Sequence, residues 1–326
     1  MSTPFLPSAE RKSIVIAMIV AVVLFLGGAL AASAYEAYLV TAADASLNLY
    51  NLSTNNLIET ITSGLGKSSV VVGPNNRLAF VSTGSILSVI DLTVGREVRR
   101  IQGLYIASGS MTFTPDGKWL LFADQAGSGY TYTLDVFDPV RMELVRRVPL
   151  APVMGYGAAS NPLGSIMVVG EKAYVAAANP DPNHPAIAVV DLRTLRVRPI
   201  TIPEGHFDFY LYPQPPNAAA TADGKYVVMV ETESPSGTYD LLLISTTTNT
   251  VVADNVLTYD PLGIVVPTGA DPAYGYFLGF GPDGYLSATV LDLRNGSSTF
   301  GQLLPQTEVL IGQSYFYAPT GLAANA

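Results

Sequence analysis

Short apolar runs separated by small polar turns recur along most of the chain. The clearest is TFTPDGKWLLFAD at residues 112–124, and similar patterns are TADGKYVVMVE at 221–231 and GPNNRLAFVS at 73–82. PDG and ADG place a turn former and a Gly able to adopt positive φ between two strands. The strand that follows is apolar nearly throughout, as expected of a strand buried on both faces. The pattern therefore predicts a hairpin from a short inner strand into a buried one.

This pattern defines six repeated units, each with an apolar strand, a second strand that usually ends in Asp, and a third strand of mixed polarity. The units span residues 37–61, 78–103, 119–150, 173–202, 226–257 and 276–304. A short fourth segment, such as SGSMTFTPDGK or NAAATADGK, leads into the next unit. Four strands recurring at intervals of roughly 40 to 55 residues, with no amphipathic helix between them, predict an all-β fold. We expect a β-propeller of four-stranded blades, with six repeats counted.

The C-terminal segment SYFYAPTGLAANA, residues 314–326, resembles the segment that precedes each repeat, yet no repeat follows it. We expect it to supply the inner strand of the first blade. That pairing would join both ends of the chain in one sheet and remove an unpaired edge.

An acid closes the second strand of four units, and the four residues are Asp91, Asp138, Asp191 and Asp292. Acids at equivalent positions resemble a binding site, but each of these directly precedes a short turn. An Asp in that position accepts backbone N–H bonds of its own turn. We therefore interpret all four as structural.

The patterns AYVAAA, SVIDL and TPDGKWLLFA resemble the propeller repeats of the YVTN family, which are similar to lactonase-like propellers. The similarity covers the chain from about residue 37 onward. It implies a propeller whose ligands lie at the central funnel. Since that family most often has seven blades, seven blades are the alternative to the six repeats counted here.

Composition and charge exclude several classes of protein. With 49% apolar and 13% charged residues in a chain of 326, a disordered protein is excluded and a substantial core is expected. The net charge of −9 opposes binding to nucleic acid phosphates. The absence of Cys excludes disulfides, thiolate metal sites, covalent haem attachment and cysteine catalysis.

The N-terminus carries an export segment followed by one domain. ERKS precedes the apolar run Ile14–Leu30 and then Ala32-Ser33-Ala34, which are the three parts of a secretory signal. The run is also close to the ~20 residues of a membrane-spanning helix, so an uncleaved anchor is the main alternative and a buried helix of a cytoplasmic fold a further one. Residues 1–34 are thus a signal peptide or N-terminal membrane anchor, and 35–326 a single β-propeller domain. We expect that domain outside the cytoplasm: secreted, periplasmic or on the cell surface.

Long connections are predicted to gather on one face of the propeller, opposite a face of short turns. Long ordered loops on a rigid scaffold are where binding residues usually lie, and Tyr, Phe and Pro in them favour a contact surface over a hydrolytic centre. The candidate ligand-binding or partner-binding residues in these loops are His184, His206, Phe207, Asp208, Tyr210, Tyr212, Tyr259, Tyr315 and Tyr317.

Both histidines of the chain, His184 and His206, fall in these loops. With Asp181 and Asp208 they would offer a mixed nitrogen and oxygen metal set. Their spacing matches no established motif, and no nucleophile or oxyanion loop accompanies them. We therefore expect no metal and no cofactor, and assign no catalytic residue.

Five arginines, Arg146, Arg147, Arg193, Arg196 and Arg198, are predicted on or near outer strands. Charge there commonly protects an exposed sheet edge, and we prefer that interpretation to an anionic ligand site.

The sequence favours the interpretation that this is a non-enzymatic binding or scaffold protein of the cell envelope. We expect it to contact an envelope protein or glycan through its aromatic loops. Membrane contact is expected only through the N-terminal segment, if it stays uncleaved. The first alternative is an exported lactonase-like hydrolase or a cofactor-dependent oxidoreductase, with His184, His206 and Asp208 near the channel mouth. The second is a structural surface-assembly subunit that self-associates. Propellers with the same fold have many unrelated functions, so the resemblance predicts the fold and says little about function.

Overall fold

The computed structural model describes residues 38–43, 46–51, 56–62, 69–82, 85–104, 106–126, 131–150, 166–176, 186–201, 218–233, 238–257, 260–266, 274–280, 285–304, 309–313 and 322–324. These residues form strands and turns and contain no helix. Accordingly, no membrane-spanning helix is found within them. The predicted export segment, residues 1–34, lies outside the described residues.

The described strands form six four-stranded antiparallel sheets. In the first sheet the order is β24 (Leu322–Ala324), β1 (Tyr38–Ala43), β2 (Ser46–Asn51) and β3 (Asn56–Thr62). The second sheet holds β4 (Ser69–Val72), β5 (Leu78–Ser82), β6 (Ile86–Asp91) and β7 (Arg96–Gln102). The third holds β8 (Ile106–Phe113), β9 (Leu120–Ala126), β10 (Thr131–Asp138) and β11 (Glu143–Pro149).

The remaining three sheets repeat this order. The fourth holds β12 (Ile166–Val169), β13 (Lys172–Ala176), β14 (Ala186–Asp191) and β15 (Val197–Thr201). The fifth holds β16 (Ala218–Ala220), β17 (Tyr226–Glu233), β18 (Thr238–Ser245) and β19 (Thr250–Leu257). The sixth holds β20 (Asp260–Val265), β21 (Tyr274–Phe280), β22 (Tyr285–Asp292) and β23 (Val309–Gln313).

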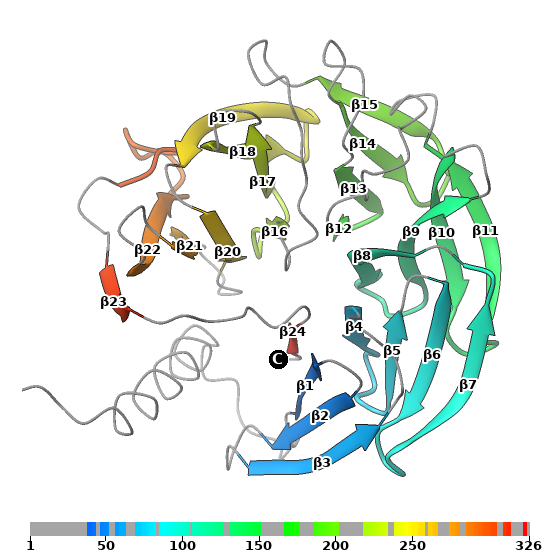
Figure 1. The fold of residues 1–326 in the computed structure, drawn as a ribbon. Helices are drawn as coiled ribbons and strands as arrows, with labels where there is room; N and C mark the ends of the chain where they lie inside the picture. Colours follow the sequence, from blue (N-terminus) through cyan, green and yellow to red (C-terminus); the bar gives the residue numbers. More distant parts are fainter. Residues whose placement is uncertain are drawn as a thin grey trace, which may run out of the picture.

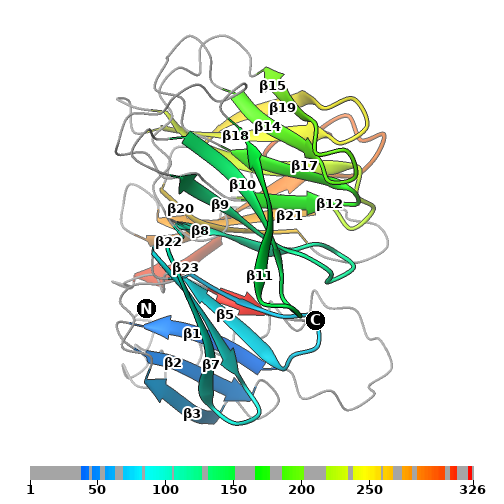
Figure 2. The same cartoon turned by 90° about the vertical axis from the view of Figure 1, so that its right-hand side faces the viewer.

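Successive sheets lie side by side around a common centre, with the first strand of each sheet innermost (Figure 1). Neighbouring inner strands contact one another in the order β24, β4, β8, β12, β16 and β20. Figure 2 views the same sheets from the side on which the outer strands β7, β11 and β15 lie. This arrangement is consistent with a propeller-like fold.

The two ends of the chain meet in the first sheet. Strand β24 pairs antiparallel with β1, and Leu322, Ala323 and Ala324 stand opposite Thr41, Val40 and Leu39. The C-terminal segment thus supplies an inner strand, as its likeness to the segments before each repeat predicted.

One predicted boundary was wrong. The sixth unit was expected to end at residue 304, but its outer strand β23 lies farther on, within the stretch predicted to be a connecting loop. Residues 293–304 instead form turns, tied back by an isolated bridge between Leu291 and Leu303. The apolar VLIG segment pairs with β22 because it can complete the sheet, which the polar stretch RNGSST cannot do as well.

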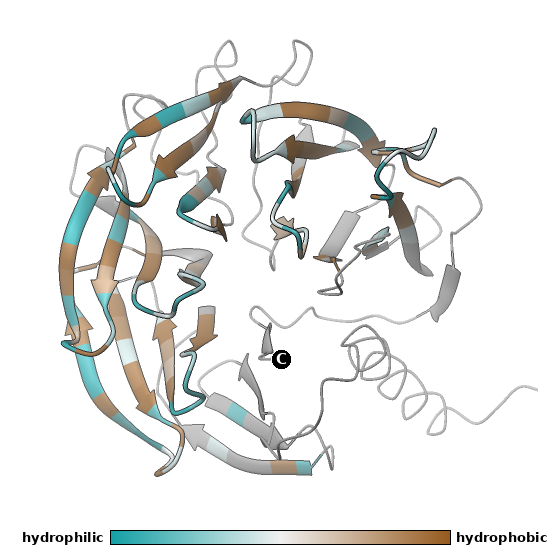
Figure 3. Cartoon of the chain, turned by 180° about the vertical axis from the view of Figure 1, so that it is seen from behind, coloured by the Kyte–Doolittle hydropathy of each residue, from teal (hydrophilic) through white to brown (hydrophobic). Residues whose placement is uncertain are grey.

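Apolar side chains fill the spaces between successive sheets. Between the second and third sheets the largest are Phe80, Phe122 and Phe137, all at most 1% exposed. Similar clusters lie between the third and fourth, fourth and fifth, and fifth and sixth sheets. Middle strands are therefore mostly apolar on both faces, whereas apolar and polar residues alternate along the outer strands (Figure 3). Each fully buried Leu, Ile or Phe contributes about 1.5–3 kcal/mol to stability.

The TPDGKW and TADGKY turns have the same geometry, as the repeat predicted. The Thr114 hydroxyl donates to Asp116 at 2.6 Å and accepts the Trp119 N–H at 3.0 Å. Thr221 makes the corresponding bonds to Asp223 at 2.7 Å and from Tyr226 at 3.0 Å. Gly117 and Gly224 have φ of 67° and 66°, the left-handed conformation that favours glycine.

Candidate functional site

The loop residues predicted to bind a ligand or partner all lie outside the described residues. These are His184, His206, Phe207, Asp208, Tyr210, Tyr212, Tyr259, Tyr315 and Tyr317, and the weak metal candidate Asp181 is outside them too. They stay predictions. Within the part of the chain that the structure describes, no group of three or more His, Cys, Asp or Glu side chains is placed to hold a metal ion.

The four strand-closing acids are turn residues, which confirms their structural interpretation. Asp91 accepts the Thr93 N–H at 2.9 Å, and Asp138 accepts those of Val140 and Arg141, each at 2.9 Å. Asp191 accepts two N–H groups of its turn, and Asp292 accepts one, at 2.7–3.0 Å.

Asp292 has the densest set of donors. Its fully buried carboxylate accepts the Arg294 guanidinium at 2.7 and 2.9 Å, the Ser297 hydroxyl at 2.7 Å and the Thr299 hydroxyl at 2.6 Å. These bonds, Arg294 first, hold the pKa of Asp292 far below its usual range. The guanidinium also lies 5.2 Å from the ring centre of Tyr274. All the donors come from its own turn, so this acid organises the long turn that precedes β23.

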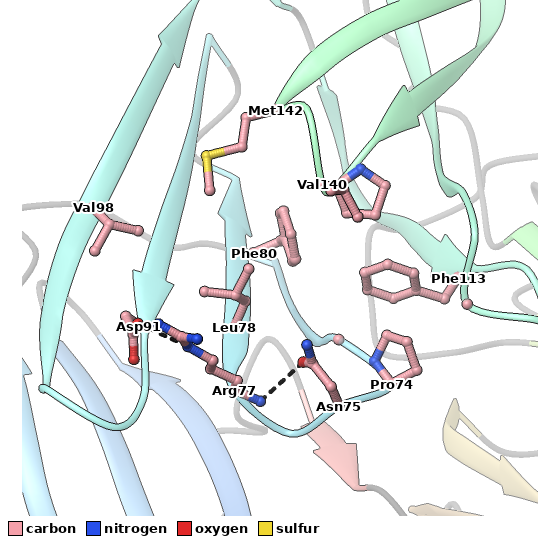
Figure 4. A pocket seen from close by; sticks show the side chains of 13 residues that line it. Pro74, Asn75, Arg77, Leu78, Phe80, Asp91, Val98, Phe113, Val140 and Met142 are labelled. Carbon is pink, nitrogen blue, oxygen red and sulfur yellow. Dashed lines mark hydrogen bonds and ion pairs between the residues drawn. The ribbon is translucent and has the colours of Figure 1, made fainter.

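An apolar pocket of about 460 Å³ opens between the second and third sheets, on the face of the short turns (Figure 4). Its wall combines turns and strands of both sheets: Gly73, Pro74, Asn75, Arg77, Leu78, Phe80, Asp91, Val98, Phe113, Gly117, Pro139, Val140 and Met142. A volume of this size lies within the range of small-ligand and anchor pockets. The pocket is thus a concave site built from described residues of both sheets.

The interior of the pocket is aromatic and its rim is exposed. The rings of Phe80 and Phe113 meet edge to face at 5.5 Å. Val140 is 87% exposed and Val98 is 43% exposed, which leaves apolar surface in contact with water. Figure 4 shows Val98 and Val140 on opposite sides of the pocket, with Met142 between them, Phe80 at the centre and Phe113 next to Val140. Such a wall is suited to an apolar group and supplies no nucleophile.

An ion pair bounds the pocket on one side. Arg77 donates through Nε and Nη2 to Asp91 Oδ2 at 3.1 and 3.0 Å. The Thr93 hydroxyl and this guanidinium lower the pKa of Asp91. The pair keeps Arg77 along the rim, where its charge is already compensated. Sequence reasoning missed the pocket, although a Val in the exposed turn PVRME was a signal of it.

A second unpredicted cluster lies within the third sheet. Asp124 of β9 and Asp135 of β10 are both 0% exposed and share one guanidinium. Arg147 Nη2 lies 3.2 Å from Asp124 Oδ2, and its Nε lies 3.1 Å from Asp135 Oδ2. The Thr133 hydroxyl donates to Asp135 at 2.7 Å. Burial raises the pKa of Asp135 to about 7, opposed by the Thr133 bond and assisted by the charge of Asp124.

This acid pair is not an open active site. Neither carboxyl has exposed surface, so a substrate cannot reach them in this conformation. Two carboxyls beside one arginine nevertheless carry a charge imbalance, which a proton on Asp135 relieves. The cluster is therefore a titrating element of the sheet.

No protein-family model matches the chain, and no curated protein matches it in sequence. Solved structures do resemble it. A hydrazine synthase of Kuenenia stuttgartiensis is 17% identical, with a TM-score of 0.59 over 86% of this chain and 83% of that one. U3-55K is 8% identical, with a TM-score of 0.59 over 82% and 77% of the two chains. A protein of unknown function from Desulfotomaculum acetoxidans DSM 771 is 13% identical, with a TM-score of 0.57 over 84% and 83%.

At these sequence identities the similarity shows the fold alone, and the names of the three structures indicate no shared function. It supports an all-β architecture of four-stranded sheets. Membership of the YVTN family stays a prediction, because no family model matches the chain.

Proposed function

We propose that the chain is a six-bladed β-propeller that acts as a binding or scaffold protein of the cell envelope, outside the cytoplasm. Six four-stranded sheets and the pairing of β24 with β1 support this blade count. Pairing of the chain ends removes an unpaired edge, as ring closure requires. The basic, apolar and small-residue parts of residues 1–34 support export.

The observation that carries the binding function is the apolar pocket between the second and third sheets. Interface anchors are aromatic or aliphatic side chains that fill a preformed, desolvated cavity. The wall of Phe80, Phe113 and Met142 offers such a cavity, and the exposed Val140 beside it would be covered by a docked partner. The partner expected here is an envelope protein that inserts an apolar side chain. The aromatic loops of the opposite face remain the second predicted contact surface.

The hydrolase or oxidoreductase alternative depends on His184, His206 and Asp208, which lie outside the described residues. No described residue favours it. Recovery of the native protein with a stoichiometric metal or small cofactor, measured by native mass spectrometry, would favour this alternative over the binding function.

The test is retention of the full-length protein on purified envelopes of its own cells. Val140→Asp places a carboxylate at the pocket rim, where an apolar anchor would meet it. We expect retention to fall roughly fivefold or more, the effect of losing about 1 kcal/mol at an anchor. Val256→Asp is the matched control, because Val256 is 56% exposed on β19, far from the pocket.

A double variant, Tyr210→Ala with Tyr212→Ala, examines the opposite face in the same assay. Loss of retention only in this variant would assign binding to the loops and remove the pocket from the proposal. Wild-type retention in both the pocket and the loop variants would show that the binding proposal is wrong.

A further inference from the structure

Basic residues are unevenly distributed over the outer strands of the sheets. All the Lys and Arg of the outer strands lie on β7, β11 and β15, which belong to the second, third and fourth sheets. Outer strands β3 and β19 carry Glu59 and Asp254 as their charged residues, and β23 has none. The chain as a whole has a net charge of −9, so this basic sector opposes the average.

Three of these arginines occupy the same position in their sheets. Arg99, Arg146 and Arg198 stand opposite Val89, Val136 and Val189. Each of these valines lies two residues before the Asp that closes its strand. In the first and fifth sheets the equivalent position holds Glu59 and Ala253.

β-Bulges bring the three arginines into line. The second and third sheets have a bulge between the outer two strands, which adds Val98 before Arg99 and Val145 before Arg146. The fourth sheet has no such shift. A bulge changes the register beyond it by one residue. Without the extra valines, Arg99 and Arg146 would lie one position away from the level of Arg198. We call these three residues the arginine row.

The charge of the arginine row is exposed and uncompensated. Arg99, Arg146 and Arg198 are exposed, and none forms an ion pair within the described part of the chain. Six other exposed arginines each pair with an acid: Arg77, Arg100, Arg141, Arg147, Arg193 and Arg294. Arg96 at the start of β7 and Arg196 just before β15 are also exposed and form no ion pair with a described residue, so the row is distinguished by its shared register position. Protection of a sheet edge requires charged side chains, but these need neither have the same sign nor occupy the same register position in successive sheets. The row therefore carries a feature that edge protection does not explain.

The geometry of the row suits a flexible linear polymer. It offers one charge per sheet, whereas a small anion needs several donors converging on one point. Successive sheets turn around the centre (Figure 1), so a flat lipid surface cannot meet the three outer edges equally, but a flexible chain can follow them. Duplex nucleic acid is stiff over about 50 nm, so it cannot follow the turning outer edges as a flexible chain can.

We propose that the arginine row is a docking strip for a linear anionic polysaccharide that crosses the outer edges of the second, third and fourth sheets. The carboxylate or other anionic groups of successive sugars would pair with Arg99, Arg146 and Arg198. This gives the proposed envelope function a specific partner class, bound by arginines that do not line the pocket, although Val98 of the pocket directly precedes Arg99.

The test uses the full-length protein in detergent and immobilised polygalacturonate, with neutral dextran as the uncharged reference. We expect wild type to bind polygalacturonate and not dextran. The triple variant Arg99→Gln, Arg146→Gln, Arg198→Gln is expected to bind at least tenfold more weakly. Counterion release also predicts that the slope of log affinity against log salt concentration falls by up to about three.

The matched control is Arg141→Gln, Arg193→Gln, Lys118→Gln, which removes the same charge from ion-paired or turn positions. It should bind within about twofold of wild type. If both triple variants lost the same affinity for polygalacturonate, net charge alone would explain the binding and the proposal would be overturned. Absence of wild-type binding, or binding to anionic vesicles or duplex DNA in preference to the polysaccharide, would overturn it as well.

Failure of this proposal is distinguishable from failure of the binding function. The Val140→Asp variant should bind polygalacturonate as wild type does. A protein that is retained on envelopes but ignores the polysaccharide would keep the pocket and lose only the arginine row.

Discussion

Replacement of Asp135 by Asn should remove a pH-dependent cost of folding. Asp135 is fully buried, and its pKa of about 7 lies some three units above the usual Asp value of ~3.9. Between those two values the folded state binds more protons than the unfolded state. Stability therefore falls as pH rises through this window, and the loss is complete above about pH 7.

The size of the effect follows from the pKa difference. Each unit corresponds to about 1.4 kcal/mol, so ionisation of Asp135 costs roughly 4 kcal/mol at alkaline pH. Asn keeps the size of the protonated side chain but cannot ionise; its one amide oxygen can accept from Arg147, while its NH2 group can donate to the Thr133 hydroxyl. We expect the stability of Asp135→Asn relative to wild type to increase by roughly 4 kcal/mol between pH 4 and pH 8.5.

The assay is urea unfolding of both proteins at pH 4, 5.5, 7 and 8.5, followed by Trp119 fluorescence and circular dichroism. The quantity compared is the free energy of unfolding of the variant minus that of wild type, followed as a function of pH. The changed contact with Arg147 adds a constant to this difference and so does not alter its pH dependence. A difference that stays flat across the series would refute the reasoning. A variant that becomes relatively less stable with rising pH would show that the carboxylate is stabilised by Arg147 after all.

Three further results are expected. Asp292→Asn should destabilise the fold most near neutral pH, and the difference from wild type should shrink as pH falls below ~4. The reason is that the pKa of Asp292 is lowered in the folded state, so its carboxylate stabilises the fold above that pH. A difference in urea midpoints that does not change with pH would contradict this. Gly117→Ala should lower the free energy of unfolding by roughly 1–3 kcal/mol more than Gly103→Ala does. Both glycines have positive φ, but only at Gly117 would an added Cβ lie 2.4 Å from Pro74. Equal melting temperatures of the two variants would refute the clash. Removal of residues 322–326 should lower the melting temperature by several degrees, since β1 loses its partner β24, and an unchanged value would show that this pairing adds no stability.

The local chemistry of strands and turns could be predicted from sequence because neighbouring residues decide it. The TPDGKW and TADGKY turns, the closing acids Asp91 and Asp292, and the apolar strands between them follow from φ preferences, side-chain caps and short continuous apolar runs. The boundary of the sixth unit was predicted wrongly because only the local pattern was used. Residues 293–304, with the polar run RNGSST, resembled the end of a unit, and only the pairing with β22 identified β23.

The sequence by itself determined an all-β chain of six repeats, the structural role of four turn acids and the return of the C-terminus to the first sheet. Tertiary structure alone decided the pocket, whose wall joins Pro74, Phe113 and Val140 from segments of two sheets. It also decided the pKa of Asp135, since the burial of a strand Asp depends on what packs over it. The arginine row depends on bulges that shift the register by one residue, which composition and spacing do not reveal. In each case the physical reason is that the property belongs to a contact between distant segments, and no single stretch of the chain contains it.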